Sequence, residues 1–218
     1  MKPDERVAAG GSGSYLDKEA RHGAGAELRA LAELALRVAD SPLSAELEAV
    51  AELVVAALRA RGRLFFCGNG GSAADAQHLA AEYVVRFRRE RRPLAALALT
   101  TDASVLTAGA NDFGFKGVFA RQIEALGRRG DVLFLHSTSG ESENLLAAAA
   151  AARERGLLTV ALLAKGGGRL AEKVDHALVV PTEEAARAQE LHIAMGHAVC
   201  ELVDRALAGA RAEEGAGG

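Results

Sequence analysis

The chain has 218 residues, of which 25% are charged and 50% are hydrophobic, and its formal net charge is −3 at pH 7. This length suits one globular domain with a real core, and the slight acidic excess disfavours binding to nucleic acid. No apolar run approaches the roughly 20 residues that a membrane span needs, and residues 1–6 lack the apolar core of an export signal. The two cysteines, Cys67 and Cys200, are too few for a disulfide framework. We therefore expect a cytoplasmic protein that binds neither membrane nor nucleic acid.

Both ends of the chain are rich in small residues. The run from Gly10 to Ser14 makes residues 1–15 a predicted flexible leader, and residues 208–218 form a predicted flexible tail. Residues 16–207 contain no tandem repeat and no change of composition that would divide them. We expect them to form a single domain.

Two helices are predicted before the first strand. Apolar residues recur at helical spacing within residues 16–40. Ser41 and Pro42 then suit an N-cap and a first helical position, so that a second helix begins there. It is expected to run to about Arg61 and to end at Gly62.

Five short apolar runs, separated by helical stretches, predict the strands of one sheet. They span residues 64–67, 94–99, 132–135, 158–163 and 177–180. Because each run is continuous rather than alternating, both faces of each strand are buried, which is typical of a parallel sheet covered by helices. A long final helix is predicted over residues 183–207. The predicted fold class is therefore α/β, a three-layer sandwich with a five-stranded parallel sheet and an N-terminal helical pair.

A glycine-rich turn follows the first predicted strand. The segment Gly68-Asn69-Gly70-Gly71-Ser72 stands between that strand and a helix, where open α/β sheets bind their ligands. Glycines let backbone N–H groups approach a ligand, and the helix directs its positive end there. The pattern matches neither the dinucleotide nor the ATP fingerprint. A plain tight turn with Ser72 as N-cap is the alternative.

A cluster of hydroxyls follows the third predicted strand. Ser137, Thr138, Ser139 and Ser142 surround one turn before a helix. Hydroxyls and helix N-terminal amides suit a phosphate, and ordinary capping would need only one of them. Two such turns at one edge of the sheet indicate a phosphorylated small molecule as ligand.

Two helices carry candidate acid, base or metal-ligating side chains. His78 and Glu82 share a helix face because they are spaced i,i+4, although an exposed pair without function has the same spacing. Gln189, His192 and His197 lie on the final helix, and helix geometry does not choose between the two histidines. The remaining histidines, His22, His136 and His176, are interpreted as structural, and Cys67 and Cys200 as buried apolar residues.

Taken in order, these motifs together with Asn111-Asp112-Phe113-Gly114 and Gln189-Glu190-Leu191-His192 resemble one family. It is the sedoheptulose-7-phosphate isomerase (phosphoheptose isomerase) branch of the sugar isomerase, or SIS, superfamily. The resemblance covers residues 16–207 and implies a flavodoxin-like five-stranded sheet and a homotetramer with active sites at subunit interfaces. It implies conversion of D-sedoheptulose 7-phosphate to D-glycero-D-manno-heptose 7-phosphate, the first step of nucleotide-activated heptose biosynthesis.

The resemblance also implies roles for individual residues. Glu82 and His197 match the family's catalytic pair, which favours His197 over His192. Ala186 stands where the family often has an aspartate, so the anomer of the product stays open. The implied zinc site, one per subunit, consists of His78, Glu82, Gln189 and His197. The implied sugar-phosphate site consists of Asn69, Gly70, Gly71, Glu82, Asn111, Asp112, Ser137, Thr138, Ser139, Ser142 and Gln189.

Two alternatives belong to other functional classes. The segment from Ser72 to His78 also resembles a non-catalytic SIS adaptor that binds the bacterial replication initiator protein. That adaptor is expected to lack the carboxylate and the last histidine, so Glu82 and His197 favour an enzyme. A sugar-phosphate-binding regulator would need a DNA-binding module, for which the segment before the sheet is too short and too acidic.

Overall fold

A computed structural model describes residues 23–208 of the chain, so the predicted leader, His22 and almost all of the predicted tail lie outside it. The helices are α1 (Ala24–Ala39), α2 (Leu43–Arg59), α3 (Gly71–Val84), α4 (Ala103–Phe113), α5 (Ala120–Leu126), α6 (Glu143–Arg155) and α7 (Ala185–Leu207). The strands are β1 (Leu64–Gly68), β2 (Ala96–Ala98), β3 (Val132–His136), β4 (Leu158–Leu163) and β5 (His176–Val179), and short 3₁₀ segments span Phe115–Gly117 and Lys165–Lys173.

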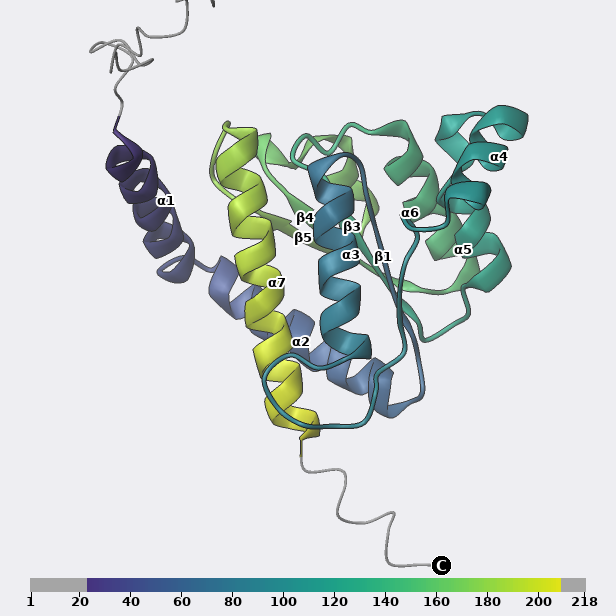
Figure 1. The fold of residues 1–218 in the computed structure, drawn as a ribbon, viewed down its shortest axis with the longest axis horizontal. Helices are drawn as coiled ribbons and strands as arrows, with labels where there is room; N and C mark the ends of the chain where they lie inside the picture. Colours follow the sequence, from purple (N-terminus) through teal and green to yellow (C-terminus); the bar gives the residue numbers. More distant parts are fainter. Residues whose placement is uncertain (1–22, 209–218) are drawn as a thin grey trace, which may run out of the picture.

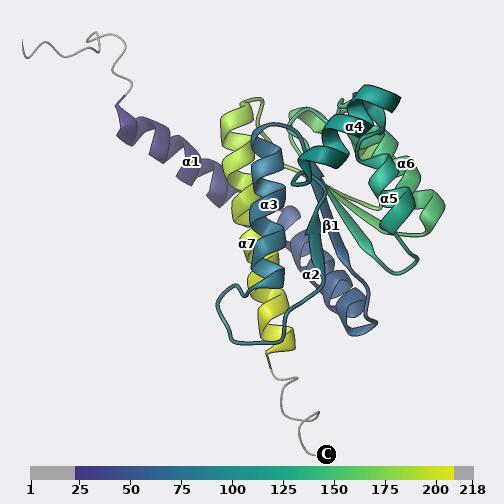
Figure 2. The same ribbon diagram turned by 45° about the vertical axis from the view of Figure 1, so that its right-hand side comes forward.

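The five strands form one parallel sheet in the order β2-β1-β3-β4-β5. Helices α2, α3 and α7 cover one face, while α5 and α6 cover the other (Figures 1 and 2). Helix α1 extends to the side of this sandwich (Figure 1). The predicted three-layer α/β fold with an N-terminal helical pair is confirmed. The chain reverses its direction of winding between β1 and β3, which is where such sheets place their ligands.

Two boundaries differ from the sequence prediction for identifiable reasons. Strand β2 is shorter than predicted because the Leu94 amide bonds to the Tyr83 carbonyl at the end of α3, 3.1 Å away, instead of to β1. Helix α2 begins one residue after Pro42, and the Ser41 hydroxyl accepts a hydrogen bond from the Leu43 amide at 3.2 Å. The N-cap is therefore Pro42, one residue later than predicted, and the Ser41 side chain still satisfies the first amide of the helix.

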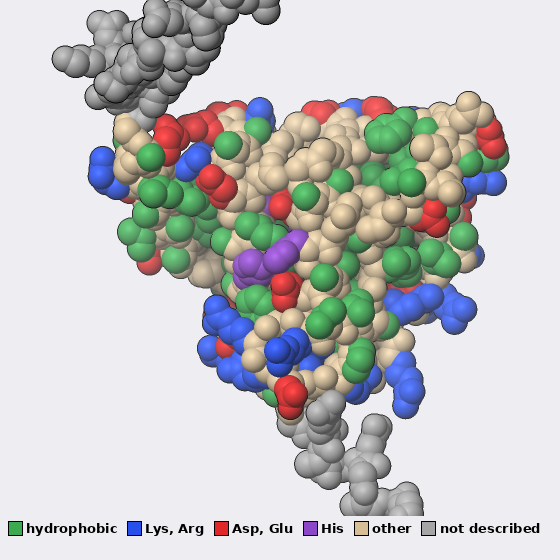
Figure 3. All heavy atoms as spheres, viewed as in Figure 1, with side chains coloured by type: hydrophobic (Ala, Val, Ile, Leu, Met, Phe, Trp, Pro, Cys, Tyr) green, Lys and Arg blue, Asp and Glu red, His purple; other side chains and the backbone are tan. Residues whose placement is uncertain are grey.

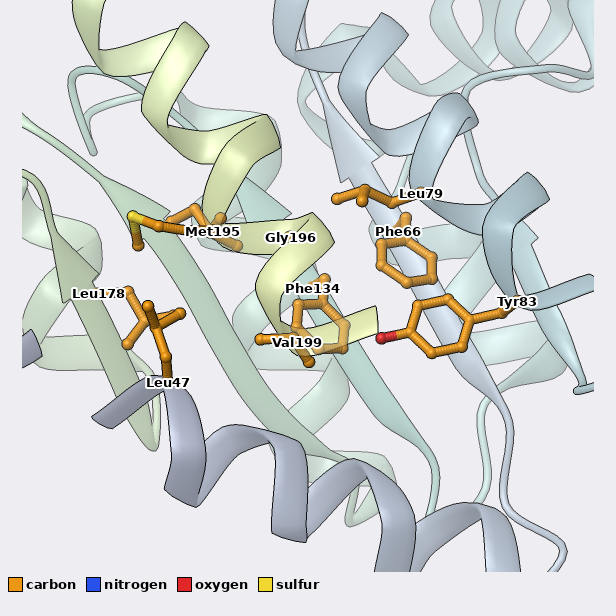
Figure 4. A pocket seen from close by; sticks show the side chains of 10 residues that line it. Leu47, Phe66, Leu79, Tyr83, Phe134, Leu178, Met195, Gly196 and Val199 are labelled. Atoms are coloured by element: carbon orange, nitrogen blue, oxygen red, sulfur yellow. The ribbon is translucent and has the colours of Figure 1, made fainter. Parts of the chain in front are cut away.

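The apolar layer beneath α3 and α7 brings these two helices close together. Phe66 of β1 stacks on Phe134 of β3 with ring centroids 4.9 Å apart. Above them, Leu79 of α3 packs against Gly196 of α7, and both residues line a small apolar pocket (Figure 4). A Cβ atom on Gly196 would lie 2.6 Å from the Leu79 side chain, so glycine permits this close approach. None of the helices in residues 23–208 is long and apolar enough to cross a membrane.

Two histidines are buried in the same layer. His136 is 0% exposed at the end of β3, and both of its ring nitrogens lack a hydrogen-bond partner within residues 23–208. His192 is equally buried, and its Nε2 bonds to the Leu163 carbonyl oxygen at 3.0 Å. Burial, assisted by the neighbouring His192, lowers the pKa of His136 to about 3. Both rings are therefore neutral parts of the core at neutral pH.

We predict that His136→Leu flattens the acid-side pH dependence of stability. The unfolded chain binds a proton at His136 near pH 6.5, whereas the folded chain resists it down to about pH 3, so this group lowers the free energy of unfolding as pH falls through that window. Urea unfolding of both proteins at pH 8, 6 and 5 measures the difference. Equal changes of the free energy of unfolding with pH in the two proteins would contradict the prediction. At pH 8, where the histidine is neutral in both states, the difference between the proteins measures the effect of the substitution on packing alone.

Candidate functional site

The two predicted ligand-binding turns lie side by side at the carboxyl edge of the sheet. Gly68 at the end of β1 pairs in register with His136 at the end of β3. The Asn69 and Asn144 side-chain amides exchange two hydrogen bonds, of 3.0 and 2.8 Å, across the gap between the turns. Asn144 was not predicted from the sequence. Its position in the first turn of α6, directly after the hydroxyl cluster, is the signal that could have indicated it.

The glycine turn depends on glycine at two positions. Gly70 has φ +56° and ψ −124°, a conformation that only glycine adopts without strain. Gly71 begins α3, and a Cβ atom there would overlap the Gln189 side chain from α7. Gly70 rather than Ser72 is the N-cap and makes no side-chain cap bond, so the first amides of α3 face the turn without a capping side chain.

In the hydroxyl turn, which comprises residues 137–142, the Ser137 and Ser139 hydroxyls accept hydrogen bonds from the turn's own backbone, whereas the Ser142 side chain does not cap α6. The Ser137 hydroxyl accepts from the Gly140 amide at 3.0 Å, and the Ser139 hydroxyl accepts from the Glu141 amide at 3.3 Å. Ser142 stands at the N-cap of α6, yet its side chain makes no capping hydrogen bond. The cluster is therefore more than a helix cap, and the start of α6 is open to an anion.

A second glycine-rich segment supports the hydroxyl turn from behind. Gly167 and Gly168 pack closely against the turn: a Cβ on Gly140 would overlap the Gly167 carbonyl oxygen, and a Cβ on Gly168 would overlap the Ser139 carbonyl oxygen. The Leu170 amide donates to the Gly140 carbonyl at 3.0 Å, and Arg169 binds the Glu141 carboxylate with its Nε at 2.6 Å. Sequence reasoning missed this support, although three consecutive glycines after β4 mark it.

His78, Glu82 and His197 form a cluster between α3 and α7. The Nε2 atoms of the two histidines are 2.7 Å apart, and His78 Nε2 lies 3.4 Å from a Glu82 carboxylate oxygen. Phe87 stacks on the His197 ring at 5.2 Å between centroids. On this face of the molecule, histidine side chains form one patch beside an acidic side chain (Figure 3). Burial first, and His78 second, lower the pKa of His197, which favours its neutral form.

This cluster has the chemistry of a metal site and of an acid–base site. One ligand atom from each of its three residues lies within 4.8 Å of the others. Two imidazole nitrogens and a carboxylate oxygen form a donor set that zinc accepts. A carboxylate and a neutral imidazole held this close together can equally carry protons to and from a bound substrate.

The remaining predicted site residues fall into three positions. Gln189 lies against Gly71. Burial raises the pKa of the nearby Asp75 carboxyl, and Gln189 and His78 offset only part of that rise. His192 points into the core and takes no part in the cluster. Asn111 and Asp112 lie exposed on α4, where the Asn111 amide donates to Asp112 at 2.8 Å. Asp112 lines a separate surface hollow between α4 and α5, away from the two turns.

The two cysteines are buried and free, as the sequence indicated. Burial raises the pKa of the Cys67 thiol far above its usual range. Burial likewise raises the pKa of Cys200 to about 12. Neither thiol ionises at neutral pH, so neither serves as a nucleophile.

Comparisons with known proteins identify the family of the chain. A family model described as a SIS domain matches residues 28–164. The phosphoheptose isomerase of Rhodospirillum rubrum is 50% identical over 186 residues, covering 83% of this chain and 97% of that protein. The phosphoheptose isomerase of Roseiflexus sp. (strain RS-1) is 57% identical over 159 residues, covering 73% of this chain and 81% of that protein.

A solved structure extends the match to the fold. Phosphoheptose isomerase GmhA from Neisseria gonorrhoeae superposes with a TM-score of 0.77 at 42% identity, covering 83% of this chain and 96% of that one. The SIS-domain match spans more than half of the chain, and the relatives are matched over most of their length. The chain therefore belongs to the phosphoheptose isomerase family of SIS-domain proteins.

Proposed function

We infer that this protein is an aldose–ketose isomerase that converts D-sedoheptulose 7-phosphate to D-glycero-D-manno-heptose 7-phosphate, the first step of nucleotide-activated heptose biosynthesis. The observation that carries this inference is the meeting of Glu82 and His197, from two helices, in one cluster between α3 and α7. The relatives described above carry the enzyme's name, and they lend no support to the alternative of a replication-initiator adaptor.

The phosphate end of the sugar is assigned to the hydroxyl turn. Thr138, Ser139 and Ser142 would donate to phosphate oxygens, and the N-terminus of α6 would add its positive end. Asn69, Gly70 and Gly71 of the neighbouring turn would hold the sugar hydroxyls or the carbonyl oxygen.

The reaction moves a proton between two adjacent carbons through an enediol. Glu82 is the group that removes the carbon-bound proton and returns it to the neighbouring carbon. His197, neutral because its pKa is lowered mainly by burial, accepts and returns the proton of the sugar oxygens. Proton transfer of this kind by positioned side chains contributes on the order of 10²–10⁴ in rate.

We propose that the same cluster holds one zinc ion per subunit. His78, Glu82 and His197 fit as ligands because their donor atoms already lie together, and Gln189, which contacts Gly71 and Asp75, would be the fourth. Bound there, the ion would supply positive charge for the enediolate oxygens. A carboxylate held by zinc is a weaker base, so the effect of removing the ion bears directly on the role of Glu82.

We further propose a homotetramer in which neighbouring subunits complete the active sites. Helix α4 has no buried residue, and Phe113 and Phe115 beside it are each 58% exposed. A helix with such a surface needs a covering partner, and a second copy of this chain would cover it. Asn111 and Asp112 could then reach the sugar bound by a neighbouring subunit. The proposed location is the cytoplasm, which also suits two free cysteines.

The direct test is incubation of the pure protein with sedoheptulose 7-phosphate, followed by NMR. We expect heptose 7-phosphate to accumulate, with the anomer read from the product signals. A parallel sample treated with a chelator, then resupplied with zinc, shows whether turnover depends on the ion. Absence of product in all samples would contradict the proposed function.

Glu82→Gln is expected to lower kcat by about 10²–10⁴ because it keeps the shape of the side chain and removes the base. Glu154→Gln, an exposed change on α6, is the matched control and is expected to keep the native rate. Steady-state kinetics with sedoheptulose 7-phosphate measures both. Undiminished turnover by Glu82→Gln would refute the role assigned to this carboxylate.

His197→Ala and His192→Ala separate the two histidines of α7. We expect His197→Ala to lower kcat by 10²-fold or more, on the order expected for loss of a proton-transfer group. His192→Ala removes the bond to the Leu163 carbonyl and should cost about 1–3 kcal/mol of stability with little loss of rate. Kinetics and thermal unfolding of both variants check this, and the reverse pattern would assign the chemistry to His192.

A further inference from the structure

Arg91 is a buried charge that the chemistry described above does not use. It lies in the loop that leaves the end of α3, passes the end of α7 and returns to β2 (Figures 1 and 2). Residues 86–92 contain five arginines, and Arg91, 6% exposed, is the one among them whose side chain is buried. A guanidinium inside a protein needs hydrogen-bond acceptors for its N–H groups. The acceptors of Arg91 therefore identify the elements that this side chain connects.

The Arg91 side chain joins α3 to α7 through hydrogen bonds from its Nε, Nη1 and Nη2 atoms. Its Nη2 donates to the Glu82 carbonyl oxygen at 2.7 Å, and its Nη1 donates to the Tyr83 carbonyl oxygen at 2.8 Å. These carbonyls belong to the last turn of α3, where helical partners are lacking and a cation is favoured. Its Nε donates to a carboxylate oxygen of Asp204 on α7 at 2.6 Å.

Asp204 is itself fully engaged and 1% exposed. Its second oxygen accepts the backbone amides of Arg88 and Arg89, at 2.8 and 3.0 Å. Although burial raises the pKa of this carboxyl, the bonds from Arg88, Arg91 and Arg89 hold it below its usual range. Asp204 therefore fixes both the loop and the guanidinium to α7, about two helical turns after His197.

We propose that Arg91 is a positioning residue that sets the offset between Glu82 on α3 and His197 on α7. The inference depends on the proposed roles of those two side chains. Arg91 binds the backbone of Glu82 itself, while its partner Asp204 lies on the helix that carries His197. A buried ion pair is a weak source of net stability compared with apolar packing, whereas a planar fork with several fixed donors specifies a geometry.

Arg91→Lys tests this because lysine keeps the charge and loses the fork. We expect kcat for sedoheptulose 7-phosphate to fall by about 10–100-fold, since a misplacement near 1 Å costs about that much, with KM changed less than about threefold. The matched control is Arg92→Lys, at the exposed neighbouring arginine, which is expected to keep native kinetics. An unchanged kcat in Arg91→Lys would overturn the proposal.

A double-mutant cycle shows whether Arg91 acts through Glu82. In the Glu82→Gln background, we expect Arg91→Lys to cause little further loss of kcat, because the group that it positions is already disabled. Losses that multiply would assign Arg91 a general structural role and overturn the proposal. Native turnover by Glu82→Gln alone would instead refute the role assigned to Glu82, and absence of product from the native protein would refute the proposed function, both independently of Arg91.

A spectroscopic measurement covers the case in which activity is lost through unfolding. In the metal-free protein, the ring ¹⁵N signals of His78 and His197 report their contact at 2.7 Å. We expect these signals to shift in Arg91→Lys and in Asp204→Asn and to stay in place in Arg92→Lys. Thermal unfolding curves are recorded for all three proteins to establish that each one is folded. Unshifted signals in a folded Arg91→Lys protein would contradict the proposal.

Discussion

The close contact of α3 with α7 is the constraint on which the candidate site depends. Each helix carries part of the cluster, and neither holds it alone: His78 and Glu82 lie on α3, whereas His197 lies on α7. Gly196 lets Leu79 approach within a distance that any larger residue would prevent. Because Gly196 directly precedes His197 and Leu79 directly follows His78, this packing contact also holds the two histidine side chains close together.

The parallel sheet supplies the second half of the arrangement. Its strand order places the ends of β1 and β3 side by side, so two turns distant in sequence meet at one edge. The exchange of hydrogen bonds between Asn69 and Asn144 joins the turns, and the glycine-rich segment after β4 supports the hydroxyl turn. In the proposed function, backbone amides, hydroxyls and helix N-termini would bind the phosphate without a lysine or arginine in the turn, while the proposed acid–base groups stand apart on the helices.

Much of the fold followed from pattern because buried parallel strands give continuous apolar runs; the strand predicted at 158–163 matches β4 (Leu158–Leu163). The predicted length of β2 was too great because Leu94 is apolar like a strand residue, yet its amide bonds to the end of α3. Helix spacing could not choose between His192 and His197, since that choice depends on what each face of α7 packs against. Asn144, Arg91 and Asp204 were missed because their partners are distant in sequence. Asn111 and Asp112 lie apart from the other predicted sugar contacts, and a single chain does not show what they face.

We propose that one sugar phosphate spans from a hydroxyl turn to a cluster between α3 and α7 in the assembled protein. A crystal structure of the Glu82→Gln protein with sedoheptulose 7-phosphate is the decisive measurement. We expect the phosphate at Ser137–Ser142 and the first two carbons of the sugar within hydrogen-bond reach of residue 82 and His197, counting every subunit of the assembly. A phosphate bound elsewhere, or a sugar whose reacting carbons lie beyond reach of both side chains, would contradict it.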